Sequence, residues 1–95
     1  MALARLFECP GWTAEQYGLL IKTVDRRASL GGRAWRGNLF HWATLTTEGI
    51  LAVDVSESRE AADRLAQDLL APAVAELGLS MPTITEHEVR NHLAP

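Results

Sequence analysis

Two strand-like runs of the sequence place a histidine opposite an aspartate. Residues 38–45 and 50–55 are rich in aromatic, aliphatic and β-branched side chains, and Thr46 to Gly49 between them predicts a hairpin turn. In that register His41 faces Asp54 across the strand pair at about 5 Å. A carboxylate so placed orients the imidazole and raises its pKa, as a general base requires. A purely structural hydrogen bond is the alternative.

The same register divides the hairpin side chains between two faces. One face carries His41 and Asp54 together with Ala43 and Ala52, and the other carries a bulkier set that includes Trp42. We expect the bulkier set to form core under the helices and the His41 face to stay uncovered. The two alanines are small enough to leave room beside the histidine for an apolar or aromatic ligand.

The elements that must position this hairpin are predicted from capping and breaking signals. Thr13 and Gln16 form a capping box that starts a helix. Trp12 and Tyr17 are spaced as the hydrophobic staple of the same helix. Pro72 lies inside a second helical pattern and should kink or break it, because proline lacks the N–H and clashes with the preceding turn.

The order of elements indicates the fold. We predict a strand over 2–9, a helix from 13 to about 29, the two hairpin strands, a helix from 58 to 77 and an edge strand over 83–89. This is the βαββαβ order of the ferredoxin-like α+β fold, with a four-stranded antiparallel sheet and two helices on one face. A small chain cannot leave an apolar sheet face in water, so we expect a homodimer through the uncovered face or a flat apolar ligand on it.

Length and composition limit the class of protein. The 95 residues predict one domain over residues 1–95, and the net charge of −3 disfavours a nucleic-acid partner. No apolar run approaches the roughly 18 residues of a membrane span, and the first residues lack a signal-peptide pattern. The single Cys9 cannot form an internal disulfide and is expected to be a small buried hydrophobe. We therefore expect a cytoplasmic protein with no membrane partner.

Three segments carry a resemblance to a known family: Gly37-Asn-Leu-Phe-His-Trp-Ala43, the run from Gly49 to Arg64, and His87-Glu-Val-Arg-Asn91. The chain resembles, over nearly its whole length, the small uncharacterised proteins of the dimeric α/β-barrel superfamily, relatives of the antibiotic-biosynthesis monooxygenase domain. The resemblance implies that two ferredoxin-like protomers pack sheet against sheet as a barrel, with an apolar cavity in each. Members of that superfamily include cofactor-free oxygenases, haem-degrading enzymes, polyketide cyclases and small stress proteins.

Other candidate ligand-binding residues lie outside the hairpin. Trp35, between Arg33 and Arg36 in a glycine-bounded loop, can stack on an aromatic ligand as a lid while an arginine meets an anionic group. A loop tryptophan docked on the surface is the alternative. His87 is a second ionisable group that can point into the barrel, and a solvated edge histidine is its alternative.

The sequence gives little support for a metal or a cofactor. His87 and His92 are five residues apart, which is not a metal-ligand spacing within one strand, and His41 is the single good candidate for a haem ligand. GxGxxG, P-loop, GxSxG and HExxH motifs are absent from the sequence. We therefore expect no metal and no cofactor.

Two functions fit these observations. In the first, the chain is a cofactor-independent enzyme, an oxygenase, cyclase or isomerase, acting on an aromatic or polyketide-like substrate in an apolar barrel cavity. His41, oriented by Asp54, would then abstract a phenolic or α-carbonyl proton. In the second, the chain is a non-catalytic dimeric ligand-binding or stress-associated module, whose cavity merely holds a ligand or is filled by side chains.

Overall fold

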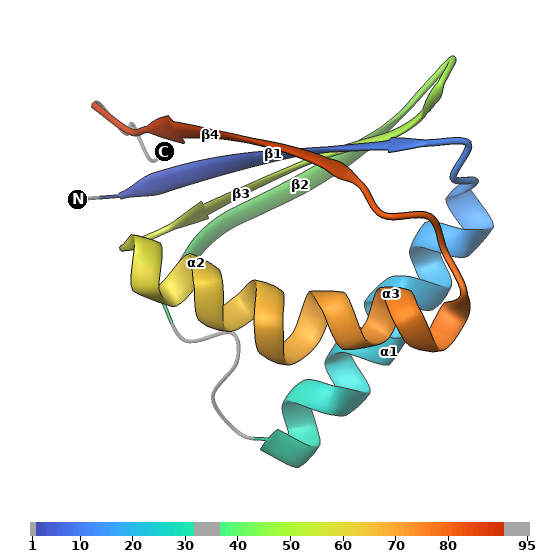
Figure 1. Ribbon diagram of the computed structural model, residues 1–95, viewed down its shortest axis with the longest axis horizontal. Helices are drawn as coiled ribbons and strands as arrows, with labels where there is room; N and C mark the ends of the chain where they lie inside the picture. Colours follow the sequence, from blue (N-terminus) through green and yellow to red (C-terminus); the bar gives the residue numbers. More distant parts are fainter. Residues whose placement is uncertain (1, 32–36, 91–95) are drawn as a thin grey trace.

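The computed structural model describes residues 2–31 and 37–90, in which all helices lie on one side of a single antiparallel sheet (Figure 1). The sheet order is β2-β3-β1-β4, so the last strand lies at an edge as predicted. The ferredoxin-like α+β architecture is confirmed. In chain order the elements are β1 (Leu3–Pro10), α1 (Ala14–Gly31), β2 (Asn38–Thr46), β3 (Gly49–Ser56), α2 (Arg59–Leu65), η1 (Ala66–Leu70), α3 (Ala71–Leu77) and β4 (Thr83–Glu88).

Helix α1 begins at the predicted capping box. The Thr13 N–H donates to Gln16 Oε1 at 3.0 Å, and the Gln16 N–H donates to Thr13 Oγ1 at 3.1 Å. Trp12, directly before the cap, is buried, and its indole N–H donates to the Ser80 carbonyl oxygen at 3.2 Å. These contacts fix where the chain leaves the sheet and enters the helical layer.

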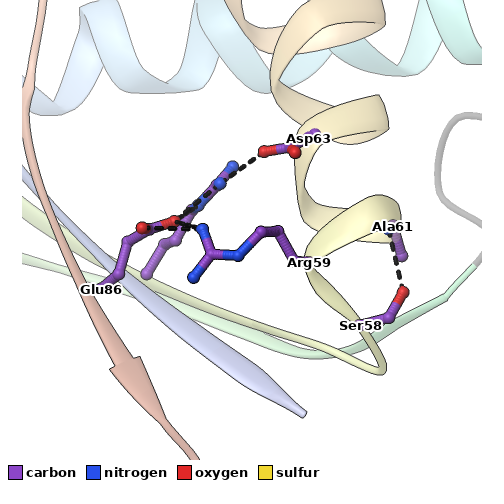
Figure 2. Close-up of polar contacts among 6 residues, drawn as sticks. Ser58, Arg59, Ala61, Asp63 and Glu86 are labelled. Carbon is purple, nitrogen blue, oxygen red and sulfur yellow. Dashed lines mark hydrogen bonds and ion pairs between the residues drawn. The ribbon is translucent and has the colours of Figure 1, made fainter. Parts of the chain in front are cut away.

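The second helical segment is regular except for one π-helical turn directly before the part that contains Pro72. Ser58 caps α2 by accepting a hydrogen bond from the Ala61 N–H at 3.1 Å (Figure 2). Residues 66–70 then form the π-helical turn η1, closed by the Ala71 N–H on the Ala66 carbonyl, and α3 continues to Gly78 in the left-handed conformation. The irregularity lies just before Pro72, whose missing N–H the wider turn accommodates. Within the described ranges, none of the helices has the length and apolarity needed to cross a membrane.

The hairpin register is the predicted one, but the sheet faces are the reverse of the prediction. His41 pairs with Asp54 and Trp42 with Val53 in β2 and β3. Ala52 and Asp54 are buried beneath the helices, whereas Trp42 is 41% exposed on the other face. The prediction that Trp42 forms core is therefore wrong, and so is the prediction that the His41 face is uncovered.

The reversal follows from the volume that the helices themselves supply. They bring large aliphatic side chains to the interface, among them Leu20, Val24, Leu65 and Leu69, each at most 5% exposed. Small strand residues such as Ala52 leave space for these side chains and for a cavity between the sheet and the helices.

The uncovered side of the sheet, called the open face below, is polar along β4 and mostly apolar over the other three strands. Its apolar side chains are those of Ala4, Leu6, Phe40, Trp42, Leu51, Val53 and Val55. Phe40 is 50% exposed and Trp42 41% exposed there, and the aliphatic members are only partly covered. Large apolar side chains clustered at the surface are a feature of faces that assemble or bind ligands.

An ion-pair network closes one end of the layer between the sheet and α2. The Arg5 guanidinium on β1 donates to Asp63 of α2 at 2.6 Å and to Glu86 of β4 at 2.7 Å. Arg59 adds a further hydrogen bond to Glu86 at 2.9 Å (Figure 2). Because the Arg5 side chain is only 12% exposed, these contacts hold α2 against two strands.

Candidate functional site

A cavity of about 200 Å³ lies between the sheet and the helices. Side chains of all four strands and of α1, η1 and α3 reach it, so one chain forms the cavity between its own sheet and helices. Nearly all of its walls are apolar. The lining residues are Phe7, Cys9, Trp12, Tyr17, Leu20, Ile21, His41, Ala52, Asp54, Ala66, Gln67, Leu70, Ala71, Val74, Met81, Pro82 and Ile84.

The predicted histidine and aspartate meet at the wall of this cavity. His41 Nδ1 lies 2.6 Å from Asp54 Oδ1, so Nδ1–H donates to the carboxylate. Asn38 Nδ2 donates to the same oxygen at 3.3 Å. Asp54 is 5% exposed, and these contacts therefore fix the carboxylate and, through it, the imidazole ring.

Tyr17 completes a chain of three side chains that the sequence did not indicate. Its hydroxyl lies 2.5 Å from His41 Nε2, and the two rings are nearly parallel at 9°. In the neutral imidazole, with Nδ1 protonated toward Asp54, Nε2 is the acceptor and the Tyr17 hydroxyl the donor. We expected Tyr17 to be part of a helix staple, and its role here depends on how α1 lies over β2, for which the sequence contains no signal.

The electrostatics of the chain favour a basic histidine and a neutral tyrosine. The hydrogen bond with Asp54 raises the pKa of His41 above its ordinary 6.5, although burial alone would lower it. Burial, with a further contribution from the Asp54 charge, raises the pKa of Tyr17 from 10.0 to about 12. Tyr17 therefore keeps its proton at neutral pH and serves as a hydrogen-bond donor.

The other predicted site residues are only partly brought together. Ala52 lines the cavity, whereas Ala43 packs against the core without lining it. His87 is exposed and pairs with Ala4 on the open face, so the structure does not bring it to the cavity. Arg33 and Trp35 lie outside the described residues.

The π-helical turn supplies cavity residues that were not predicted. Ala66, Gln67 and Leu70 of η1 all line the cavity, and Gln67 is exposed at its edge. π turns occur often at functional sites, because the extra residue turns side chains out of the regular helical phase. Cys9 also lines the cavity, and burial raises the pKa of its thiol to about 11, which keeps it unreactive at neutral pH.

The described part of the chain contains no group of three or more His, Cys, Asp or Glu side chains arranged to hold a metal ion. What the cavity does contain is one oriented imidazole and one phenol donor in apolar surroundings. Such a site can remove a proton from an acidic O–H or C–H group and hydrogen-bond the resulting oxyanion.

Known structures share this fold. The cofactor-independent oxygenase SnoaB from Streptomyces nogalater is 18% identical, with a TM-score of 0.57 over 99% of this chain and 96% of that one. The monooxygenase from the gene ActVA-Orf6 of Streptomyces coelicolor, solved with the ligand nanaomycin D, is 18% identical, with a TM-score of 0.60 over 99% and 91%. A candidate antibiotic biosynthesis monooxygenase from Chloroflexus aurantiacus is 17% identical, with a TM-score of 0.63 over 97% of both chains. No protein-family model and no curated protein sequence matches the chain.

The chain thus has the ferredoxin-like fold of the antibiotic-biosynthesis monooxygenases, as the sequence resemblance implied. Cofactor-independent oxygenases are among the proteins that share it.

Proposed function

We propose that the protein is a cofactor-independent oxygenase that oxidises a phenolic aromatic compound in the cavity, with His41 as general base. The observation that carries the proposal is the chain Asp54–His41–Tyr17 at the wall of an otherwise apolar cavity. The shared fold with a cofactor-independent oxygenase supports it.

The proposed reaction begins with proton transfer. The substrate hydroxyl approaches His41 Nε2 and loses its proton there, and the imidazolium is held by the Asp54 carboxylate. The Tyr17 hydroxyl, which donates to Nε2 before a substrate binds, turns from that nitrogen to the substrate oxygen and hydrogen-bonds the phenolate that forms. The apolar walls lower the polarity around both groups, which strengthens both interactions.

Dioxygen is the oxidant. The phenolate transfers electrons to O₂ and a C–O bond forms at a ring carbon that carries hydrogen, which gives a peroxide. Loss of that hydrogen as a proton and cleavage of the O–O bond release water and leave a carbonyl. In total one phenol and one O₂ give one quinone and one water, and the proton taken up by His41 is returned.

The test is oxygen consumption with a panel of one- to three-ring phenols, recorded together with quinone absorbance. We expect His41→Gln and Tyr17→Phe to lose most turnover, and His87→Gln, a matched change at an exposed histidine outside the cavity, to retain it. Turnover should rise with pH through the raised pKa of His41, since only the neutral imidazole accepts a proton. Full turnover in His41→Gln would refute the proposal, and a panel that binds without being oxidised would favour the non-catalytic binding module.

We also propose that the protein is a homodimer formed through the open face, in a reducing compartment such as the cytoplasm. The support for the dimer is the exposed aromatic pair Phe40 and Trp42 among aliphatic neighbours on β2 and β3. Sedimentation should show a dimer for the wild type and a monomer for Trp42→Glu. Leu19→Glu, which changes an exposed leucine on α1 instead, should stay dimeric. A wild-type monomer at micromolar concentration would refute the proposal.

A further inference from the structure

We infer that the cavity selects a neutral phenol with a single aromatic ring. The inference rests on the proposed function for the ligand's hydroxyl, and on the volume and charge of the cavity for its size and neutrality.

The size argument starts from the volume of about 200 Å³. An apolar cavity of about 150 Å³ holds one benzene ring. The space here therefore accommodates one ring with one or two small substituents, and three fused rings would have to displace a wall or extend past Met81 and Ile84 at the exposed edge. Protein cores are close-packed, so displacing a wall costs free energy that a smaller ligand does not lose.

Leu70 is a wall residue whose size can change the volume of the cavity with little effect on the core. It lines the cavity from the π-helical turn η1 and is only half-buried. Truncating it therefore enlarges the cavity without emptying the centre of the core, where Leu69 and Val74 lie. Its position makes it a residue that determines specificity.

The charge argument rests on the residues that line the cavity in the described ranges. These include no lysine and no arginine, and the Asp54 carboxylate already contacts the imidazole. An anionic ligand would lose its hydration there without gaining a cationic partner of its own. A ligand that enters neutral and gives its proton to His41 avoids that cost.

The experiment measures binding without turnover, by calorimetric titration under nitrogen with phenol, β-naphthol and phenanthrol. If hydrophobic association alone decided affinity, phenanthrol would bind most tightly and phenol most weakly, because affinity would follow the buried apolar area. We expect the reverse order, with phenol bound about tenfold more tightly than phenanthrol. Leu70→Ala should strengthen β-naphthol binding about tenfold, and Leu77→Ala, a half-buried leucine that packs on the core without lining the cavity, should not.

A filling variant provides an independent measurement if Leu70→Ala does not fold. Ala66→Leu adds bulk to the cavity wall and should weaken phenol binding, while Ala75→Leu on the exposed side of α3 should leave it unchanged. For charge, para-hydroxybenzamide should bind more tightly than para-hydroxybenzoate, which has a similar shape and a negative charge.

Tightest binding of phenanthrol by the wild type, or no binding of phenol, would overturn the inferred ring size. Tighter binding of the benzoate would overturn the inferred neutrality. Because oxygen is absent, these results are separate from the fate of the oxygenase proposal. Size-selective binding with no later oxidation contradicts only the proposed function, and oxidation of three-ring phenols alone contradicts only the size inference.

Discussion

The titration of Tyr17 tests the geometry of the site directly, because it is the only tyrosine of the chain. Burial is the largest cause of its raised pKa, and the Asp54 charge is the second, so the phenol should ionise at about pH 12 instead of 10.0. In Asp54→Asn the midpoint should fall below 12 but stay above 10.0, since burial persists. Asp63→Asn, which removes a carboxylate from the Arg5 network at the end of the layer between α2 and the sheet, should leave the midpoint where it is.

The assay is the ultraviolet absorbance of tyrosinate during an alkaline titration, with circular dichroism recorded on the same samples. The dichroism separates ionisation in the folded chain from ionisation after unfolding. Tyrosinate that appears near pH 10 while the chain is still folded would show a solvated hydroxyl and refute the burial argument. An unchanged midpoint in Asp54→Asn would refute the effect of the Asp54 charge on the Tyr17 hydroxyl.

Three further predictions concern stability and are checked by urea unfolding. The free energy of unfolding should fall as pH rises from about 6.5 through the raised pKa of His41, because the protonated imidazole pairs with Asp54. His41→Gln should remove this dependence on pH. An equal dependence in the variant would contradict the pairing. Ser58→Ala should lower the free energy of unfolding by about 1 kcal/mol, because α2 loses its cap. An unchanged free energy of unfolding would mean that the cap is dispensable. Gly49→Ala should lower the free energy of unfolding by more than about 2 kcal/mol, since φ is +146° and a Cβ there overlaps the Cys9 carbonyl. Gly18→Ala, with open space around the new Cβ, serves as the control.

The pairing of His41 with Asp54 was predictable because a tight hairpin turn fixes the register of two strands. The face on which the pair lies was not, since strand alternation sorts side chains into two sets without saying which set the helices cover. That choice depends on the volume of the helix side chains that face the sheet, such as Leu20 and Leu69. How these side chains fill the space is decided only when the sheet and the helices pack together.

Local signals were the most dependable guides to the elements. The Thr13 capping box and the adjustment before Pro72 both act within one or two helical turns, and both are present. Tyr17 was missed as a site residue because its contact with His41 joins segments 24 residues apart in different layers. Contacts of that kind follow from tertiary packing, which a single sequence does not reveal.

The π-helical turn ties the shape of the cavity wall to the number of residues between α2 and α3. Such a turn is a helix that holds one additional residue, so deleting a residue from Ala66–Leu70 would leave a regular helix. The helix after the turn would keep its phase, because a π turn accommodates its additional residue locally, but Ala66, Gln67 and Leu70 would return to the regular helical positions. Val74 would stay in the core, and Glu76 would stay beside Arg26 and Arg27 of α1, to which it is bonded at 2.6 and 2.9 Å, but the cavity would lose the wall that η1 provides. Homologous chains that keep this cavity wall should therefore differ in the side chains of η1 far more readily than in the number of its residues.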